Sequence, residues 1–279
     1  MRGKTVVITG ATSGIGEVAA IRLAEQGARI VFVARDGKRA DATLAKLRKA
    51  NSAADHVVHL ADLSLLAEQK RVAGAIATES RIDVLINNAG ALFNRRIETA
   101  DGLEMTFALN HMSYFTITSL LLGKLKATPG ARIVSTSSRA HRRAKLNFDD
   151  LQARRNFSGF QVYGRSKLCN ILFTRALAKR LAGSGVTANC LHPGFVATRF
   201  GDQSGGFLQR AVAVGKSLFA ISEEDGAKTI IHLASSPDVA SVSGEYFNEC
   251  KVETPSAHAR NDADAEKLWQ ASEKIANFS

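Results

Sequence analysis

The stretch Thr9-Gly10-Ala11-Thr12-Ser13-Gly14-Ile15-Gly16 decides the fold. It follows the apolar run Val6-Val7-Ile8 and leads into an amphipathic segment, Ile15 to Gln26. A strand, a glycine-rich turn and a helix in that order place a phosphate group on backbone N–H groups at a helix N-terminus. The glycines are spaced G-x-x-x-G-x-G, in contrast to the more common G-x-G-x-x-G. The candidate cofactor contacts in this turn are Gly10, Thr12, Ser13, Gly14, Ile15 and Gly16.

The composition is that of an ordinary globular protein. The 279 residues are 45% hydrophobic and 23% charged, which is enough length for a substantial core. No linker or repeat interrupts the chain, so we expect a single domain over residues 1–279. The three cysteines match no zinc or disulfide spacing, so no metal site is expected. With no signal peptide ahead of the first strand, we expect a cytoplasmic location.

Two features could indicate other partners. The uncharged run Met105 to Gly123 is long enough for a membrane span, but its polar side chains favour a buried helix and no membrane span. The formal net charge of +11 could indicate nucleic-acid binding, but no aromatic-interleaved basic motif or recognition helix is present. A solvated basic face, or a positive field that attracts an anionic cofactor, explains the charge as well. We therefore expect no nucleic-acid partner.

Short Val/Ile-rich runs alternate with helical stretches along nearly the whole chain. The predicted strands are Thr5–Thr9, Arg29–Ala34, His56–Leu60, Val84–Asn87, Arg132–Thr136, Thr187–Leu191 and Glu245–Phe247. The predicted helices are Ile15–Gln26, Lys38–Ala50, Leu65–Glu79, Gly102–Lys126, Val162–Ala182, Glu223–Ala234 and Asp262–Ala276. This alternation predicts one doubly wound α/β (Rossmann) domain. Its parallel sheet of about seven strands would have helices on both faces and ligands at the carboxyl ends of the strands.

The end of the second strand bears on the choice of cofactor. In dinucleotide folds an acid at this tip holds the ribose 2′-OH, whereas an arginine nearby accommodates a 2′-phosphate. Ala34 takes the place of the acid, and Arg35 comes next. Arg35, together with Lys38 or Arg39, would pair with a phosphate, which favours NADP(H) over NAD(H). The alternative is that Arg35 is an ordinary surface residue.

The next two strand ends supply further cofactor candidates. Asp62 and Leu63 follow the third strand, where Asp62 could accept from an adenine amino group or, like Ser64, cap the next helix. Asn88, Ala89 and Gly90 follow the fourth. The amides Asn87 and Asn88 could brace the backbone while the small residues let a ribose approach, or the group could be a plain turn.

A candidate acid/base pair lies on one helix. Tyr163 and Lys167 are one turn apart and share a face. A tyrosine has an ordinary pKa near ~10, and a nearby ammonium lowers it, so the pair can serve in proton transfer. Ser138, at the exit of the fifth strand, could hold a substrate carbonyl oxygen. The competing interpretations are a surface pair and a turn-forming serine.

Two more segments belong to this candidate site. Asn110 lies inside the uncharged helix, where a buried amide needs hydrogen bonds; it could bind a water in a proton path or kink the helix. After the sixth strand, Pro193 and Gly194 form a turn, and Val196 and Thr198 follow them. Thr198 could orient a nicotinamide ring, or the segment could be a plain loop.

These motifs, in their order and spacing, resemble the short-chain dehydrogenase/reductase family over essentially the whole chain. The resemblance implies that Tyr163 is the proton donor or base, and that Lys167 lowers its pKa and binds the nicotinamide ribose. It also implies that Ser138 orients the substrate oxygen and that Asn110 holds a relay water. Hydride would pass between the nicotinamide and the substrate carbon, which is chemistry that belongs to the cofactor.

Twenty-four residues separate Ser138 from Tyr163, a longer gap than is usual in that family. This gap and the segments Phe148–Gln152, Ser166–Asn170 and Ser243–Phe247 resemble the retinol dehydrogenase and WW-domain oxidoreductase branch, which favours NADP(H). Membrane-bound members of that branch carry an N-terminal anchor, which this chain lacks, so a soluble reductase is expected in place of a retinoid enzyme.

Residues 195–221 are the expected substrate lid. Glycines would give it hinges, and its apolar side chains repeat at helical spacing. A core helix and a membrane-surface segment are the alternatives. The sequence therefore predicts an NADP(H)-dependent oxidoreductase for a small hydrophobic carbonyl or alcohol. The rival is a catalytically idle NADP(H)-binding sensor or scaffold. The resemblance also implies dimers or tetramers, because the family commonly pairs through helices such as Gly102–Lys126 and Val162–Ala182.

Overall fold

The computed structural model describes residues 1–194 and 222–278. Eight strands form one sheet in the order β3-β2-β1-β4-β5-β6-β7-β8, and every pair is parallel except β7 with β8. This order, with crossovers on both sides of β1, is that of a doubly wound Rossmann sheet and confirms the predicted fold class. The strands are β1 Thr5–Thr9, β2 Arg29–Ala34, β3 Val57–Leu60, β4 Val84–Asn87, β5 Arg132–Thr136, β6 Thr187–His192, β7 Tyr246–Asn248 and β8 Lys251–Val252.

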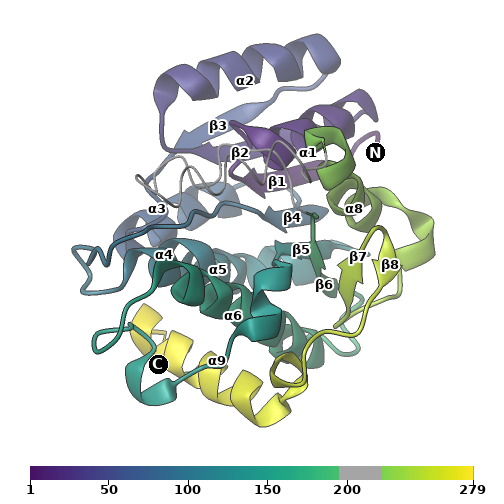
Figure 1. Cartoon of the computed structure of the whole chain (residues 1–279). Helices are drawn as coiled ribbons and strands as arrows, with labels where there is room; N and C mark the ends of the chain where they lie inside the picture. Colours follow the sequence, from purple (N-terminus) through teal and green to yellow (C-terminus); the bar gives the residue numbers. More distant parts are fainter. Residues whose placement is uncertain (195–221, 279) are drawn as a thin grey trace.

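Helices cover both faces of the sheet (Figure 1). Side chains alternate along each strand, so Val6 and Ile8 of β1 pack toward α1 and α8 while Val7 packs toward α3, α5 and α6. Two hydrophobic cores result, one on each face. The helices are α1 Gly14–Glu25, α2 Gly37–Ala50, α3 Leu66–Ala77, α4 Met105–Phe107, α5 Ser113–Lys126, α6 Gly159–Arg180, α8 Glu223–Ser235 and α9 Asp262–Ala276.

The predicted helix Gly102–Lys126 begins three residues later than predicted and is interrupted by a π-helical turn. Gly102 has φ +73°, a left-handed conformation that a helix does not contain. The helix begins at α4, where the buried Glu104 carboxylate accepts from the backbone N–H groups of Thr106 and Phe107. A π-helical turn over Ala108–Met112 then separates α4 from α5.

The end of the sheet also differs from the prediction, because β8 has no sequence signal. A tight hairpin joins β7 to β8 through Glu249 and Cys250, whose φ values are +49° and +61°. Two-residue hairpin turns of this kind usually carry glycine or asparagine, which tolerate positive φ at low cost. Neither is present here, so the strand pairing depends on the tertiary structure.

The start of α3 is capped from a distance. Neither Asp62 nor Ser64 is the N-cap, which is Leu65, a residue whose side chain cannot cap. Instead the Asp101 carboxylate, 35 residues further along the chain, accepts from the Leu66 backbone N–H at 2.8 Å. The prediction of a local cap was therefore wrong.

The C-terminal helix α9 packs against α6, beyond the layer that α6 forms on the sheet (Figure 1). Trp269 of α9 stacks on Phe173 of α6 with the ring centroids 5.9 Å apart, and it meets Phe115 of α5 edge-on at 5.0 Å. Helix α9 thus covers part of the outer face of α5 and α6. Because this chain's own helix covers it, that part of the face is not available to a second copy.

Candidate active site

The glycine turn between β1 and α1 has the conformation that its residues predict. Gly10 and Gly14 lie in the left-handed region, with φ +70° and +60°. A side chain at Gly16 would overlap the carbonyl oxygen of Gly10 and the side-chain amide of Asn88. Ser13 is the N-cap of α1, but its side chain caps no N–H group. The N-terminus of α1 therefore presents backbone N–H groups without a side-chain cap, as a phosphate site requires.

Asn88 braces the ends of three strands. Its Nδ2 donates to the carbonyl oxygens of Thr9 at 3.3 Å and Gly10 at 3.2 Å, and its Oδ1 accepts from Thr136 Oγ1 at 3.2 Å. The backbone N–H groups of Asn88 and Ala89 both donate to Thr9 Oγ1, at 3.0 and 3.1 Å. The predicted bracing role of these amides is thus seen directly: Asn88 ties the glycine turn at the end of β1 to the ends of β4 and β5.

The tip of β2 carries cationic side chains and one carboxylate, which is already hydrogen-bonded at the start of α2. Arg35 follows the strand and is exposed, and within the described residues its side chain forms no ion pair or hydrogen bond. Asp36 is the N-cap of α2, and its Oδ1 accepts from the Arg39 backbone N–H at 2.9 Å. The first turn of α2 contains no acidic residue but does contain Lys38 and Arg39. Cations at a helix N-terminus oppose the helix dipole, so this tip favours an anion.

After β3, Asp62 faces its own turn. Its Oδ1 accepts from the backbone N–H of Ser64 at 3.0 Å and from Ser64 Oγ at 2.7 Å. Leu63 is buried in the core beside α3. Asp62 is partly exposed, so the adenine contact stays a prediction.

Asn110 lies in the π-helical turn between α4 and α5. Its side chain is fully buried and both of its polar atoms are hydrogen-bonded: Oδ1 accepts from the Ala91 N–H at 2.9 Å, and Nδ2 donates to the Ala91 carbonyl and to Ser166 Oγ, both at 3.0 Å. Asn110 thereby clamps the loop after β4 to α6. A π-turn inside a helix frequently marks a functional position.

Helix α6 brings Tyr163 and Lys167 to the sheet. Both are buried, and Lys167 Nζ lies 5.7 Å from the centroid of the Tyr163 ring. Lys167 Nζ donates to the carbonyl oxygen of Thr136, at the end of β5, at 3.0 Å. The ring of Tyr114 from α5 also lies 5.7 Å from this nitrogen, on a fully buried side chain. The predicted pair therefore shares one face of α6, directed at the exit of β5.

Burial controls the protonation of this pair. It raises the pKa of Tyr163 to about 12, and a hydrogen bond with the Ser138 side chain is the contact that lowers it. It lowers the pKa of Lys167 to about 7, because an ammonium without a carboxylate partner in the described residues loses its hydration. The pKa of Tyr163 is therefore raised overall, in contrast to the expected lowering, and the Ser138 hydrogen bond offsets part of the rise. At neutral pH Tyr163 is a protonated phenol.

Ser138 lies two residues after the end of β5 and is partly buried. Its Oγ accepts from the Ala140 N–H at 3.2 Å and is the N-cap of a 3₁₀ turn, Arg139–Arg143. The turn-forming role and the contact with Tyr163 thus occur together in one residue. The predicted set of Ser138, Tyr163 and Lys167 comes together in space.

Gly90 lies where the glycine and catalytic regions meet. A side chain there would approach Asn110 Oδ1 to 3.2 Å and Lys167 Nζ to 3.4 Å. Gly90 is exposed, so its missing side chain leaves open space beside the buried lysine. The ribose contact that the sequence predicts at this position stays a prediction. Pro193 and Gly194 follow β6 on the same side of the sheet, whereas Val196, Thr198 and the expected lid at 195–221 lie outside the described residues.

The long gap between Ser138 and Tyr163 is docked onto the loop after β4, which was not predicted. Gln152 accepts from the Glu104 N–H at 2.7 Å through its side chain and from Arg96 Nε at 3.2 Å through its carbonyl. Helix α6 begins at Gly159, three residues earlier than predicted, and only a glycine fits at this position against the Phe93 carbonyl. The spacing revealed the insertion, but only the structure shows what it contacts.

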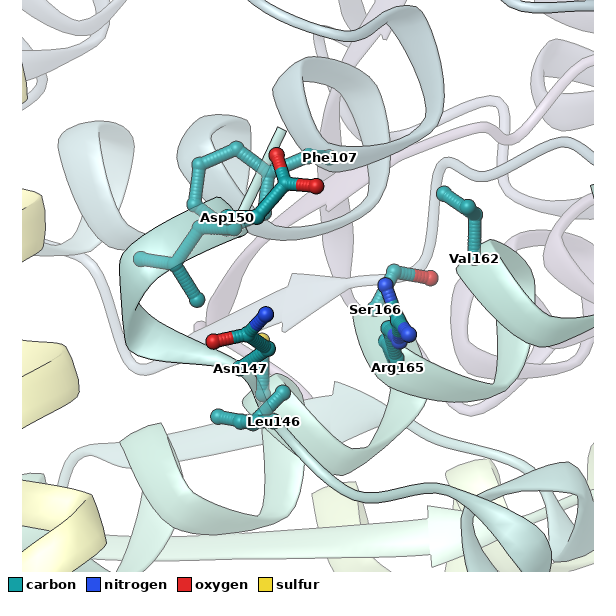
Figure 2. A pocket seen from close by; sticks show the side chains of 9 residues that line it. Phe107, Leu146, Asn147, Asp150, Val162, Arg165 and Ser166 are labelled. Atoms are coloured by element: carbon teal, nitrogen blue, oxygen red, sulfur yellow. The ribbon is translucent and has the colours of Figure 1, made fainter. Parts of the chain in front are cut away.

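A small pocket lies beside α6 between this insertion and α4, and Figure 2 shows its lining. Val162, Ser166 and Cys169 reach it from α6, and Phe107 reaches it from α4. These α6 residues lie on a different face from Tyr163 and Lys167. The pocket is therefore not the space in which the predicted catalytic groups meet.

Within the described ranges, no helix is long and apolar enough to cross a membrane, and no group of His, Cys, Asp or Glu side chains is arranged to hold a metal ion.

A glycine turn at a helix N-terminus and a buried Ser–Tyr–Lys set at the exits of neighbouring parallel strands define a dinucleotide-dependent oxidoreductase. The chain matches the short chain dehydrogenase family over residues 4–206. Retinol dehydrogenase 14 of Homo sapiens is 40% identical over 294 residues, covering 98% of this chain and 86% of that protein. Retinol dehydrogenase 12 of Mus musculus is 40% identical over 271 residues, covering 97% and 85%.

Solved structures agree. An uncharacterized protein from Mycobacterium paratuberculosis superimposes with a TM-score of 0.80 at 31% identity, covering 99% of this chain and 94% of that one. The RhlG/NADP active-site complex of Pseudomonas aeruginosa gives a TM-score of 0.71 at 26% identity, covering 93% and 97%. This chain belongs to the short-chain dehydrogenase/reductase family and is an oxidoreductase acting on alcohol and carbonyl groups. The predicted resemblance is confirmed.

Proposed function

We propose that this chain is an NADP(H)-dependent oxidoreductase that interconverts a hydrophobic carbonyl compound and its alcohol. The observation that carries the choice of cofactor is the tip of β2. Its acid, Asp36, is engaged in capping α2, while Arg35, Lys38 and Arg39 place positive charge at the same helix end. A 2′-phosphate would neutralise this charge, whereas the 2′-OH of NAD(H) would not.

The residues present fit the cofactor. The N–H groups at the start of α1 would hold its pyrophosphate, and the open space at Gly90 beside Lys167 would take the nicotinamide ribose. Asp62, Leu63, Ala89, Pro193 and Gly194 are the further contacts proposed among the described residues. When bound, NADP(H) supplies or accepts the hydride.

The chain's own residues supply the proton and the electrostatics. Tyr163 would donate its phenolic proton to the substrate oxygen in reduction, since the raised pKa keeps the phenol protonated at neutral pH. The Ser138 hydroxyl would hold that oxygen beside Tyr163. Lys167, anchored to the Thr136 carbonyl, would bind the ribose, and Asn110 would keep the loop after β4 in place while holding a relay water.

Apolar side chains around the catalytic groups support a hydrophobic substrate. Phe160, on the first turn of α6 and one turn ahead of Tyr163, is 51% exposed. Phe93, on the loop after β4, lies beside the start of this helix. The relatives named retinol dehydrogenases act on an apolar alcohol. A cytoplasmic location, a mobile lid at 195–221 and association into dimers or tetramers also stay predictions.

The decisive experiment is a panel of aldehydes, ketones and alcohols assayed with NADPH, NADH, NADP and NAD. Tyr163→Phe should lower kcat by about 10²–10⁴-fold, the usual contribution of a general acid. Tyr246→Phe is the matched control, because it also removes a buried phenolic hydroxyl while keeping the ring. Full activity of Tyr163→Phe would refute the assigned role. Cofactor binding without turnover over the whole panel would instead favour a sensor or scaffold.

Arg35→Ala tests the cofactor assignment. Losing a charge-assisted bond to phosphate, about 1.5–3 kcal/mol, should raise KM for NADPH about 10- to 100-fold and leave KM for NADH unchanged. Arg48→Ala, which removes an exposed cation from the other end of α2, controls for net charge. Equal use of NADH and NADPH by the wild type would overturn the argument from β2.

A further inference from the structure

His141 is a fully buried side chain that no sequence motif singled out. It lies in the 3₁₀ turn Arg139–Arg143, three residues after Ser138. Its Nδ1 is 2.6 Å from the Ser138 carbonyl oxygen, and its Nε2 is 3.2 Å from the backbone nitrogen of Ser256. The ring meets the Tyr246 ring of β7 edge-on, with the centroids 5.1 Å apart. One imidazole thus joins Ser138 to Ser256, which lies 115 residues beyond His141.

These two partners determine the tautomer. A carbonyl oxygen can only accept, so Nδ1 must carry the proton that bonds to Ser138. A backbone N–H can only donate, so Nε2 must be the unprotonated acceptor from Ser256. His141 is therefore neutral with its proton on Nδ1. Burial lowers the pKa of this imidazole, which favours the same neutral form.

The charged side chains around His141 are ion-paired, and the other imidazole near it, that of His192, is buried. On the same turn, Arg142 donates to the Thr254 carbonyl at 3.0 Å and pairs with Glu253, which also lies 3.7 Å from Arg139. From β6, His192 Nδ1 accepts from the Arg139 N–H at 3.3 Å, and burial lowers its pKa to about 4. Contacts from Arg139, His141 and Arg142 thereby attach the segment 253–256 to the 3₁₀ turn Arg139–Arg143. His141 is its only buried link to Ser138 among the contacts of the described residues.

Ser138 has few other restraints. Its Oγ accepts from the Ala140 N–H within the turn and contacts Tyr163. Its carbonyl oxygen accepts from the backbone of the turn and from the His141 side chain, and from no other group in the described residues. A serine that must hold a substrate oxygen beside Tyr163 needs a fixed backbone, because a misplacement of about 1 Å can cost about 10²-fold in rate.

We propose that His141 is a positioning residue for catalysis: by bonding the Ser138 carbonyl and the Ser256 N–H together, it orients the Ser138 hydroxyl toward Tyr163 and the substrate oxygen. This proposal rests on the proposed function. It predicts that the segment between β8 and α9 supports the catalytic serine although it contributes no group to the reaction.

Two substitutions separate the two bonds. In His141→Asn the side-chain amide nitrogen takes the place of Nδ1 and can donate to the Ser138 carbonyl. In His141→Gln the longer amide takes the place of Nε2 and can meet Ser256, but not Ser138. We expect His141→Asn to keep kcat within about 3-fold of wild type, and His141→Gln and His141→Leu to lower it about 10- to 100-fold. KM for the nicotinamide cofactor should change less than about 2-fold in all three, since the glycine turn is remote from this bond.

Two further arms exclude a merely structural role. In a Ser138→Ala background, His141→Gln should have no additional effect on kcat, because the imidazole acts through that serine. Independent effects on kcat, or equal losses for His141→Asn and His141→Gln, would overturn the proposal. Melting temperatures of the variants identify any that do not fold, and the Asn and Gln pair remains decisive if His141→Leu is unstable.

A readout without turnover keeps this test apart from that of the proposed function. Nitrogen-15 NMR of histidine-labelled protein, without cofactor, should show one imidazole protonated at Nδ1 and bare at Nε2, and its signals should vanish in His141→Asn. A proton on Nε2 would overturn the inference whatever the enzyme's activity. If the tautomer is as stated but no substrate is turned over, the proposed function fails and the His141 contact stands.

Discussion

The exits of β1 and β5 carry the two halves of the site, and different kinds of contact hold them. At the exit of β1, the shape of the turn resides in its own glycines, with Gly10 and Gly14 at positive φ and one amide, Asn88, packed against it. At the exit of β5, Ser138 depends on His141, and through it on Ser256, 115 residues further along. The first is a backbone conformation, and the second is a set of tertiary contacts.

The two halves of the site therefore differ in how well the sequence alone predicts them. Only glycine fits the β1 turn, so the residues there can be interpreted without knowing the rest of the fold. The β5 exit uses serine, histidine and lysine, whose roles depend on what is packed against them. Substitutions within the β1 turn should therefore disrupt the first half, whereas substitutions far from the β5 exit in the sequence should also disrupt the second half.

The largest effect is expected from Gly16→Ala. The added methyl group would overlap the Gly10 carbonyl and the Asn88 amide, so the turn must move away from the start of α1. We expect loss of detectable NADPH binding, measured by fluorescence titration or calorimetry. Gly74→Ala in α3 is the matched control: nothing lies within 4 Å, and the change should stabilise the protein by up to about 1 kcal/mol. Normal binding by Gly16→Ala would show that the turn is not locally determined.

The next largest effect should come from Trp269→Ala. This side chain stacks on Phe173 of α6, and Arg180 lies 4.1 Å above its ring. Removing it should cost about 3–5 kcal/mol of unfolding free energy, measured by chemical denaturation. Hydrogen exchange should accelerate in α6 and α9 while the amides of β1 and α1 keep their protection. Equal acceleration in both halves would contradict a separate origin of their stability.

The smallest effect is expected on the pH dependence of stability, through the buried Lys167. Its folded pKa, about 7, is below the ordinary value of 10.5, so the unfolded chain binds more protons between these two values. The cost of burying the lysine is therefore full below pH 7 and falls as the pH rises toward 10.5. Lys167→Met should be inactive but more stable than wild type at pH 7, by a few kcal/mol at most.

The measurement is the difference in melting temperature between Lys167→Met and wild type from pH 6 to pH 10. This difference should shrink as the pH rises, and the difference itself cancels the titration of other groups. Lys228→Met, at an exposed position on α8, serves as the control and should show no such trend. A gap that widens with pH would mean that the buried lysine is stabilised as the ammonium.

Several site residues were predictable because their signals are local. The glycine turn, the pairing of Tyr163 with Lys167 at helical spacing, and the strand-end positions of Asn88 and Ser138 all follow from backbone conformation and periodicity. The lowered pKa of Lys167 was not predictable, because it depends on the loss of water around a side chain packed between two tyrosine rings. Nor was the helix start at Glu104, whose carboxylate is tolerated only because the surrounding backbone N–H groups bond it.

By itself, the sequence determined the doubly wound sheet, the glycine turn and the identity of the candidate catalytic groups. These follow from side-chain alternation, helical periodicity and the steric freedom of glycine, which act over a few residues. Only the tertiary structure decided the Glu249–Cys250 hairpin, the cover that α9 gives to α6 and the link from Ser256 through His141 to Ser138. Those contacts join residues far apart in the chain, and their energies arise from burial and hydrogen bonding that exist only once the sheet has brought the segments together.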